Sequence, residues 1–360
     1  MKKLSTCGLV LYNLLAIVAA TALVEAGAFL YLAHLDAKTA SVRDPRAAEF
    51  PPGMQKLTFA KTRLYRVHAP FRSADYNVDD YGFRSVSGVR DAFEAYDPSR
   101  FNIFAFGGSS TFGVGVKDGD TWPMILQAKL RRQLPGAAVF NLGLGGFSSA
   151  DEMHLLVDLL AQNRTPAVAI FLDGGNEQCP AASDRSAAYR VLEYGLLAHV
   201  IQASNAVRLW HRVADKWRLM SEGAAGPVRP IDYKTCGAAY SAQARLVTRL
   251  LAAYGAKALF FLQPIGALLP NFDTYQFWSY SNPSVQTREN ASRLYAAVLQ
   301  SADAAHMVDL HTIMDGPARV RSDLFVDPQH PAAAGNTIIA DAILSNLQPY
   351  ISAPHEGAPQ

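Results

Sequence analysis

Short apolar runs alternate with longer amphipathic segments from Asn102 onward, and this alternation constrains the fold more than any other feature of the sequence. The runs have the length of buried strands; they are 102–106, 137–142, 167–173, 256–263 and 306–310. Helical periodicity is found in 121–134, 149–163, 238–254, 286–304 and 335–347. Strands and helices that alternate in this way form a parallel sheet with helices on both faces. The sequence therefore predicts an α/β fold.

The other segments indicate how the chain of 360 residues is organised. Residues 36–60 are mixed polar and contain several prolines, which is typical of a linker. We expect the α/β domain over 61–350, with 61–100 wrapping its edge because that stretch lacks clear periodicity. Residues 178–235 interrupt the alternation, and their tryptophans and basic residues favour amphipathic helices in an insertion, a candidate lid. Residues 351–360 are expected to form a flexible tail.

The N-terminus differs from the rest of the chain. Lys2 and Lys3 precede an apolar run that extends from about Gly8 to Leu35. A bilayer is spanned by about 20 apolar residues, whereas the apolar region of a cleaved signal has only about 7–15. We therefore expect residues 1–35 to form an uncleaved anchor in the inner membrane, with the lysines inside and the bulk of the chain on the periplasmic side. The alternative is a long cleaved signal peptide.

Glu25 is a carboxylate within the expected anchor, where charge is costly. It marks either a partner segment for this helix or a position near the outer interface. The lipid bilayer is thus one expected partner of the chain.

Charge and cysteine content narrow the function classes. The net charge is only +2 and the basic residues are scattered, which argues against a nucleic-acid groove. Metal-ligand spacings such as C-x-x-C and H-E-x-x-H are absent, and no metal or organic cofactor is expected. Cys179 and Cys236 fall in the exported part and can pair in an oxidising compartment; the alternative is two free, buried thiols. The oligomeric state stays open.

Four polar segments follow the predicted strands or stand near the C-terminus. They are GGSSTFG (107–113), NLGLGGFSS (141–149), DGGNE (173–177) and VDPQHPAAAG (326–335). In parallel α/β sheets ligands bind beyond the carboxyl ends of the strands. We therefore expect these segments to converge on one site.

The converging segments contain the parts of a serine hydrolase. A serine hydroxyl becomes a nucleophile when a histidine takes its proton, and that histidine needs an orienting carboxylate. Ser109, His330 and Asp327 are candidates for these roles. A developing oxyanion needs aimed donors, which the Asn176 amide and the backbone of the glycines after 141 can supply.

Rival interpretations of the serine segment fit less well. A phosphate loop requires a lysine where Val114 stands. The G-x-S-x-G elbow requires a glycine where Thr111 stands. A turn without function explains any one of the four segments, but their conjunction in this order favours the hydrolase.

The four segments resemble the sequence blocks of the SGNH, or GDSL-like, hydrolase superfamily. The first block, usually Gly-Asp-Ser-x-Thr-x-Gly, corresponds to 107–113, and the second, like Asn-x-Gly-x-x-Gly, to 141–146. The third, Gly-x-Asn-Asp, corresponds to 174–177, and the last, Asp-x-x-His-Pro, to 327–331. The resemblance implies a flavodoxin-like sheet of about five parallel strands in the order 2-1-3-4-5.

The resemblance also implies a role for individual residues. Ser109, Asp327 and His330 would be catalytic, and the Ser109 N–H, Gly146 and Asn176 would form the oxyanion hole. Five further residues would support the site: Gly107, Gly108, Thr111, Gly175 and Glu177. Gly108 and Glu177 each replace an aspartate of the usual blocks. These departures look like a membrane-anchored bacterial subfamily with a GGSST-type first block, which 77–84 and 261–264 also resemble.

The expected function is serine-dependent ester hydrolysis through an acyl-enzyme. The expected substrate is an envelope or exported carbohydrate that carries small acyl groups, acetyl above all. The aromatic stretch 275–280 either stacks on sugars or packs against the insertion. Two alternatives stay open: an O-acyltransferase that uses the same triad on a polysaccharide acceptor, and a non-catalytic component of polysaccharide assembly.

Overall fold

The computed structural model describes a large part of the chain, and the chain divides into two compact units. The described residues are 16, 19–34, 59–61, 66–68, 70–86, 93–177, 204–206, 209–210, 213, 232–269, 285–301, 307–315, 324–327 and 329–351. One unit comprises 1–43 with 180–231, and the other comprises 44–179 with 232–360. Most of the expected insertion therefore groups with the N-terminal residues and not with the α/β domain.

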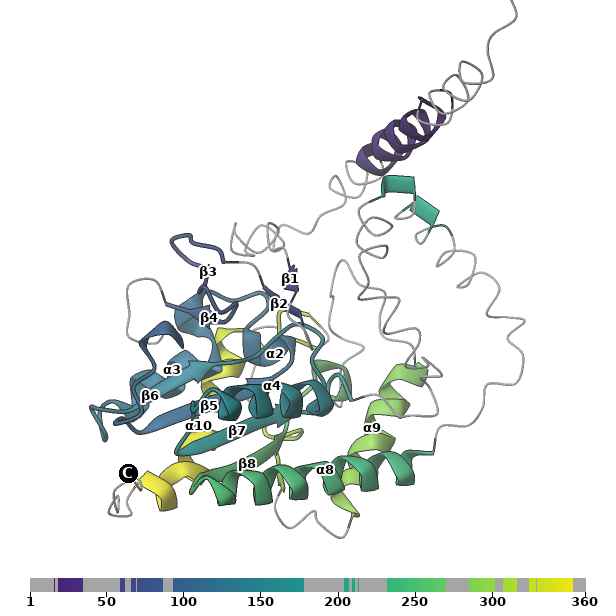
Figure 1. Ribbon diagram of the computed structural model, residues 1–360. Coiled ribbons are helices and arrows are strands. Elements are labelled where there is room, and N and C mark those ends of the chain that lie inside the picture. Colours follow the sequence, from purple (N-terminus) through teal and green to yellow (C-terminus); the bar gives the residue numbers. More distant parts are fainter. Residues whose placement is uncertain are drawn as a thin grey trace, which may run out of the picture. The chain divides into compact units, whose positions relative to one another are not determined.

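The α/β unit is built on a mixed sheet of seven strands in the order β3-β4-β6-β5-β7-β8-β9 (Figure 1). The strands are β3 (Asn77–Val78), β4 (Arg84–Ser85), β5 (Asn102–Gly107), β6 (Ala138–Asn141), β7 (Val168–Asp173), β8 (Lys257–Leu262) and β9 (Met307–Asp309). Strands β5 to β9 are parallel to their neighbours within this group. The predicted order of the five parallel strands is confirmed.

The prediction of a purely parallel sheet is wrong at one edge. Strand β3 pairs antiparallel with β4, and β4 pairs antiparallel with β6 through Arg84 and Asn141. Both added strands have two residues, which is too short to leave a periodic pattern in 61–100. A separate antiparallel pair, β1 (Phe59–Lys61) and β2 (Arg66–His68), precedes them.

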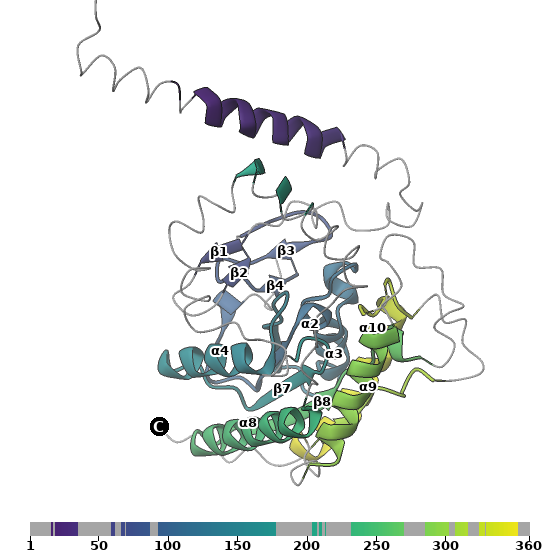
Figure 2. The same ribbon diagram turned by 90° about the vertical axis from the view of Figure 1, so that its right-hand side faces the viewer.

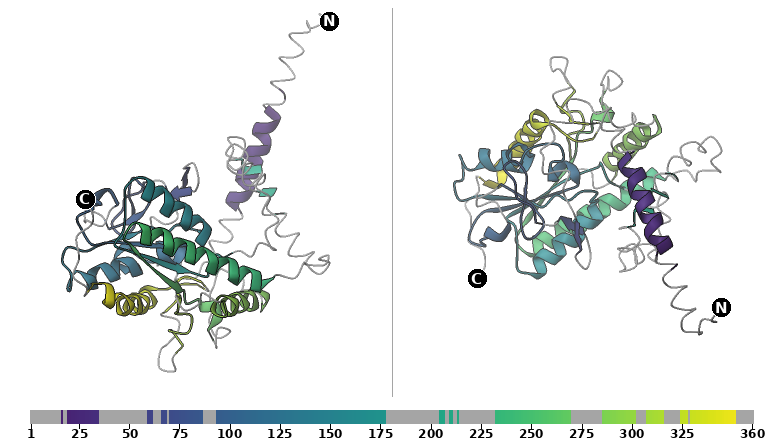
Figure 3. Two further views of the ribbon diagram at one scale, coloured as in Figure 1. Left: turned by 60° about the horizontal axis from the view of Figure 1, so that its bottom comes forward. Right: turned by 90° about the horizontal axis from the view of Figure 1, so that it is seen from above.

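Helices cover both faces of the sheet, as Figures 2 and 3 show. The longer ones are α3 (Trp122–Leu130), α4 (Ser149–Ala161), α8 (Tyr233–Ala253), α9 (Val285–Leu299) and α10 (Ala333–Ile351). Each overlaps a predicted helix. The described residues also form a short helix α2 (Ser109–Phe112) and the 3₁₀ turns η3 (Phe93–Ala95), η4 (Asp118–Asp120) and η6 (Gly266–Leu268).

The core consists of two layers because successive strand residues point to opposite faces. Phe104 and Phe106 of β5 pack in one cluster, which includes residues of α4 and α8. Ile103 and Ala105 pack in the other, which includes residues of α3 and α10. Strands buried on both faces hold their carboxyl ends in a fixed relation to one another, and the site forms there.

The N-terminal unit contains a helix over 19–34 that exposes large apolar side chains. These are Leu23, Val24, Phe29, Leu30 and Tyr31. Glu25 accepts hydrogen bonds from the hydroxyl of Ser204 and, at 2.6 Å, from the backbone N–H of Asn205. Glu25 thus contacts a segment of the expected insertion. None of the helices in the described residues has the length and apolar character needed to cross a membrane, and 1–15 of the expected anchor lie outside those residues.

Cys236 lies on α8, where it is buried and disulfide-bonded. Cys179, its expected partner, lies outside the described residues, as do the aromatic stretch 275–280 and the tail.

Candidate active site

The segments that carry Ser109, His330 and Asp327 meet at the carboxyl edge of the sheet. Ser109 begins α2 directly after β5, and His330 precedes α10. The Ser109 Oγ lies 2.8 Å from His330 Nε2, and His330 Nδ1 lies 2.6 Å from Asp327 Oδ2. The structure therefore aligns hydroxyl, imidazole and carboxylate in one hydrogen-bonded chain, as a serine hydrolase requires.

Asp327 is fixed as an ionised acceptor. Its Oδ1 accepts the backbone N–H groups of Gln329 and His330, each at 2.8 Å. Burial by itself would raise the pKa of Asp327, but these bonds and the His330 ring hold that pKa below its ordinary value. An ionised Asp327 accepts a hydrogen bond from Nδ1–H of His330, which leaves Nε2 unprotonated and able to take the proton of Ser109.

Close backbone packing explains the glycines before the serine. A Cβ on Gly107 would lie 2.0 Å from Thr111 Oγ1, and one on Gly108 would lie 2.2 Å from Asn176 Nδ2. Any larger residue would push the serine segment away from its neighbours. Thr111 is fully buried, donates to the Phe106 carbonyl at 3.4 Å and accepts from Trp122 Nε1 at 3.2 Å. These three expected supporting residues therefore all hold the turn after β5.

The expected oxyanion donors lie on three segments. Asn176, after β7, donates through Nδ2 to the Phe147 carbonyl at 2.9 Å and accepts from Gln329 at 3.4 Å. Gly146 has a φ of +79° and is exposed. In the part of the chain that the structure describes, the backbone N–H groups of Ser109 and Gly146 have no acceptor. Both are therefore free to bind a ligand oxygen.

Gly175 and Glu177 border Asn176 on either side. A Cβ on Gly175 would lie 2.1 Å from Nε2 of the buried Gln263, so a larger residue here would force that side chain to move. Glu177 accepts two hydrogen bonds from Ser149, one from its backbone N–H at 2.9 Å and one from its hydroxyl at 2.8 Å. The segment after β7 is thus tied to the start of α4.

Arg84 is a main support of the serine segment, and no sequence pattern predicted this role. Its guanidinium donates to the carbonyls of Phe112, Gly113 and Val116, and its side chain is fully buried. Its Nε lies 2.8 Å from Asp118 Oδ1, and Asn77 donates to the other oxygen of Asp118 at 2.7 Å. The one sequence signal was the resemblance of 77–84 to one subfamily. That resemblance indicates that the segment matters but not which residues Arg84 contacts.

Buried carboxyl groups behind the site were also missed. Asp173 ends β7 and accepts from the Tyr240 hydroxyl at 2.7 Å. Glu152 on α4 is buried, and its carboxyl group is hydrogen-bonded to that of Asp173. Burial raises the pKa of Glu152, Asp173 and Glu177, and the charge of Asp173 raises it further for Glu152 and Glu177. We call these three residues the carboxyl cluster.

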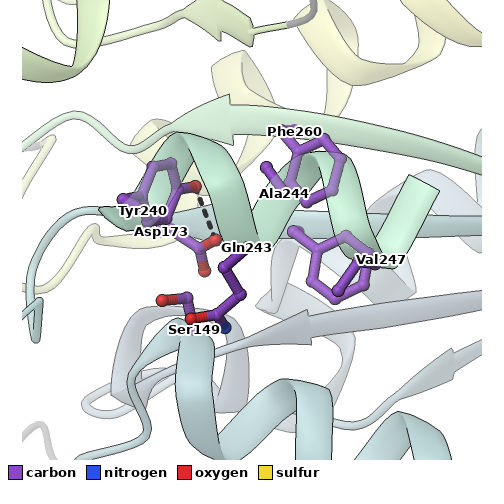
Figure 4. Close-up of a pocket in the computed structure, with 8 residues that line it drawn as sticks. Ser149, Asp173, Tyr240, Gln243, Ala244, Val247 and Phe260 are labelled. Carbon is purple, nitrogen blue, oxygen red and sulfur yellow. Dashed lines mark hydrogen bonds between the residues drawn. The ribbon is translucent and has the colours of Figure 1, made fainter. Parts of the chain in front are cut away.

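A small cavity is lined by one member of the carboxyl cluster, Asp173. Figure 4 shows the Tyr240 hydroxyl aimed at Asp173, with Ser149 and Gln243 nearby and the apolar Val247 and Phe260 on the other side.

Among the described residues, no group of three or more His, Cys, Asp or Glu side chains is arranged to hold a metal ion.

The chain is similar to several solved structures. The crystal structure of TesA is 19% identical, and the match covers 69% of this chain and 99% of that one with a TM-score of 0.40. Est24, a carbohydrate acetylesterase from Sinorhizobium meliloti, is 12% identical, with coverages of 69% and 99% and a TM-score of 0.41. The lipase/acylhydrolase from Enterococcus faecalis is 12% identical, with coverages of 69% and 95% and a TM-score of 0.40.

The sequence itself gives the family. No curated protein matches the chain. Residues 105–338 match the GDSL-like Lipase/Acylhydrolase family. This match covers more than half of the chain and includes all four predicted blocks. The chain therefore belongs to the GDSL-like lipase/acylhydrolase family and is a hydrolase of ester bonds.

Proposed function

We propose that Ser109, His330 and Asp327 are the catalytic triad of this hydrolase. The observation that carries the proposal is the continuous chain from Ser109 Oγ to His330 at 2.8 Å and from His330 to Asp327 at 2.6 Å. Both distances are within hydrogen-bond range for a nucleophile with its base and for a base with its orienting group.

The geometry supports an acyl-enzyme mechanism. His330 Nε2 takes the Ser109 proton while Oγ forms a bond to the acyl carbon. The carbonyl electrons move to oxygen, and that oxyanion is bound by the N–H groups of Ser109 and Gly146 and by Asn176 Nδ2. Collapse breaks the bond to the alcohol, which leaves with the proton from His330. A water then loses a proton to His330, attacks the acyl group and restores Ser109.

We infer that the substrate is a carbohydrate of the envelope or an exported carbohydrate that carries small acyl groups, acetyl above all. The apolar N-terminal sequence supports a membrane anchor with the hydrolase on the periplasmic side. The described helix over 19–34 exposes large apolar side chains, which suits contact with lipid. The disulfide at Cys236 suits an oxidising compartment.

Replacement of Ser109 by alanine tests the mechanism. We expect the hydrolysis of nitrophenyl acetate by the full chain in detergent to fall by roughly 10⁴-fold or more in Ser109→Ala, because no other group can form the acyl-enzyme. Ser110→Ala is the matched control, since its buried hydroxyl has no partner among the described residues. The control should keep the wild-type rate within about threefold.

Three outcomes would change the conclusion. Full activity in Ser109→Ala would refute the triad. An inactive, folded wild-type protein that transfers acetyl to an added sugar would favour the O-acyltransferase. If the folded protein binds acetylated polysaccharide but neither hydrolyses nor transfers the ester, it would be an assembly component.

A further inference from the structure

Two proposed oxyanion donors belong to different segments, and something must fix the distance between them. Gly146 follows β6, and Asn176 follows β7. These strands are not neighbours, since β5 lies between them in the sheet. Their backbones are therefore not held together by strand pairing where the donors lie.

Two consecutive residues after β7 bind the segment that carries Gly146. Asn176 donates to the Phe147 carbonyl at 2.9 Å. Glu177 accepts the Ser149 backbone N–H at 2.9 Å and the Ser149 hydroxyl at 2.8 Å. Gly146 thus lies immediately before a stretch that is held at two points from the other segment.

Glu177 contacts the first residue of α4, where the helix cannot satisfy its own backbone N–H groups. Ser149 is the first residue of α4, so its N–H has no acceptor within the helix. The carboxyl group of Glu177 supplies the acceptor that this N–H lacks within the helix. The longer side chain in place of the family's aspartate lets residue 177 reach across to α4. The departure noted in the sequence thus coincides with a contact between the two donor segments.

We propose that Glu177 is a positioning residue that holds Asn176 and Gly146 at the separation that the oxyanion requires. The inference rests on the proposed function of these two donors. Glu177 acts through Asn176 beside it and through Ser149, which follows the Gly146 turn. Loss of this contact should weaken binding of the transition state more than binding of the substrate.

Asp151 offers a matched control at the same helix end. It accepts the backbone N–H and the hydroxyl of Ser148 at 3.1 and 2.8 Å. Its contact has the same chemistry as that of Glu177, but it joins residues of one segment only. Asp151→Ala should therefore disturb α4 without separating the two donors.

The experiment compares Glu177→Ala, Glu177→Gln and Asp151→Ala in the full chain with nitrophenyl acetate. We expect kcat of Glu177→Ala to fall about 10- to 100-fold with KM within about threefold, because misplaced oxyanion donors cost that much. The affinity for a boronic acid, which forms a tetrahedral adduct on serine, should fall by the same factor. Asp151→Ala should keep kcat within about threefold.

Glu177→Gln tests whether the hydrogen bonds of this side chain or its charge position the two donors. A glutamine amide can accept from the Ser149 N–H and donate to the Ser149 hydroxyl, so it should restore most of kcat. The inference is overturned if Glu177→Ala and Asp151→Ala lose kcat equally, or if Glu177→Gln is as slow as Glu177→Ala. If Glu177→Ala does not fold, Glu177→Asp, which shortens the side chain that reaches Ser149, takes its place in both comparisons. Ser109→Ala is measured alongside: activity that survives in Ser109→Ala refutes the proposed function, whatever the Glu177 variants show.

Discussion

The two sides of the site are held by buried charges in opposite ways. On the side of β4, Arg84 is paired with Asp118 and satisfies three backbone carbonyls. On the side of β7, Glu152 and Glu177 have other carboxyl groups as neighbours, and the charge of Asp173 raises the pKa of both. One side is balanced by a cation, and on the other side burial favours protonated carboxyl groups.

This difference predicts which perturbation destabilises each side of the site. A buried ion pair fails when one partner is removed, because the other is left as an uncompensated charge. A carboxyl cluster fails when its protons are removed, because like charges then repel without water to screen them. The Arg84 side should therefore respond to mutation and the cluster to pH.

The largest effect is expected from Arg84→Met. It leaves Asp118 buried without its cation and three carbonyls without a donor, so the unfolding free energy should fall by about 3–5 kcal/mol. Thermal melting followed by circular dichroism measures the loss. Arg84→Met combined with Asp118→Asn should regain part of it, since both charges are then gone. An unchanged melting temperature in Arg84→Met would contradict the assigned role.

A smaller effect with a distinct pH signature is expected from Glu152→Gln. Burial raises the pKa of the cluster carboxyls in the folded state above their unfolded values. Their contribution to stability is therefore complete below the unfolded value of about 4 and is lost as the pH rises through the folded values. Glu152→Gln should melt at a higher temperature than wild type at pH 8, by an amount that shrinks towards pH 5.

The control for that experiment is Glu289→Gln, which changes a half-exposed carboxylate on α9. Its melting temperature should follow the wild-type pH dependence. The interpretation of the cluster fails if Glu152→Gln also runs parallel to wild type from pH 5 to 9.

The smallest effect is expected from Thr111→Val, which tests the uncharged hydrogen bonds near Arg84. The change leaves Trp122 Nε1 buried without its acceptor at 3.2 Å, a loss of about 1–2 kcal/mol. Thr111→Ser keeps the hydroxyl and should lose less, which calorimetry can resolve. If Thr111→Val melts like wild type while Thr111→Ser melts lower, the methyl group of Thr111 matters and not its hydroxyl.

The sequence predicted the parts of the fold that leave long regular patterns. The order of β6, β5, β7, β8 and β9 and the helices between them follow from apolar runs and helical periodicity together with the family resemblance. His330 and Asp327 were found because their relation is local, three residues apart. The meeting of both with Ser109 follows from the rule that ligands bind at the carboxyl ends of parallel strands.

What the sequence could not predict depends on contacts between distant residues. Strands β3 and β4 exist through pairing and not through their own composition. Arg84 reaches carbonyls about thirty residues away in the chain, which no local pattern indicates. Glu152 lies within an amphipathic helix, where a glutamate normally faces water. Its burial is a property of how α4 and α8 pack on β7.

The strand lengths at the two ends of the sheet have a consequence for association between chains. The outermost strands are β3 with two residues and β9 with three. A long unpaired edge is a template on which another chain can add a strand. Here the longer strands β6 and β8 are covered on both sides. A second copy of this protein therefore meets very little free backbone at either end of this sheet, which protects it against aggregation by strand addition.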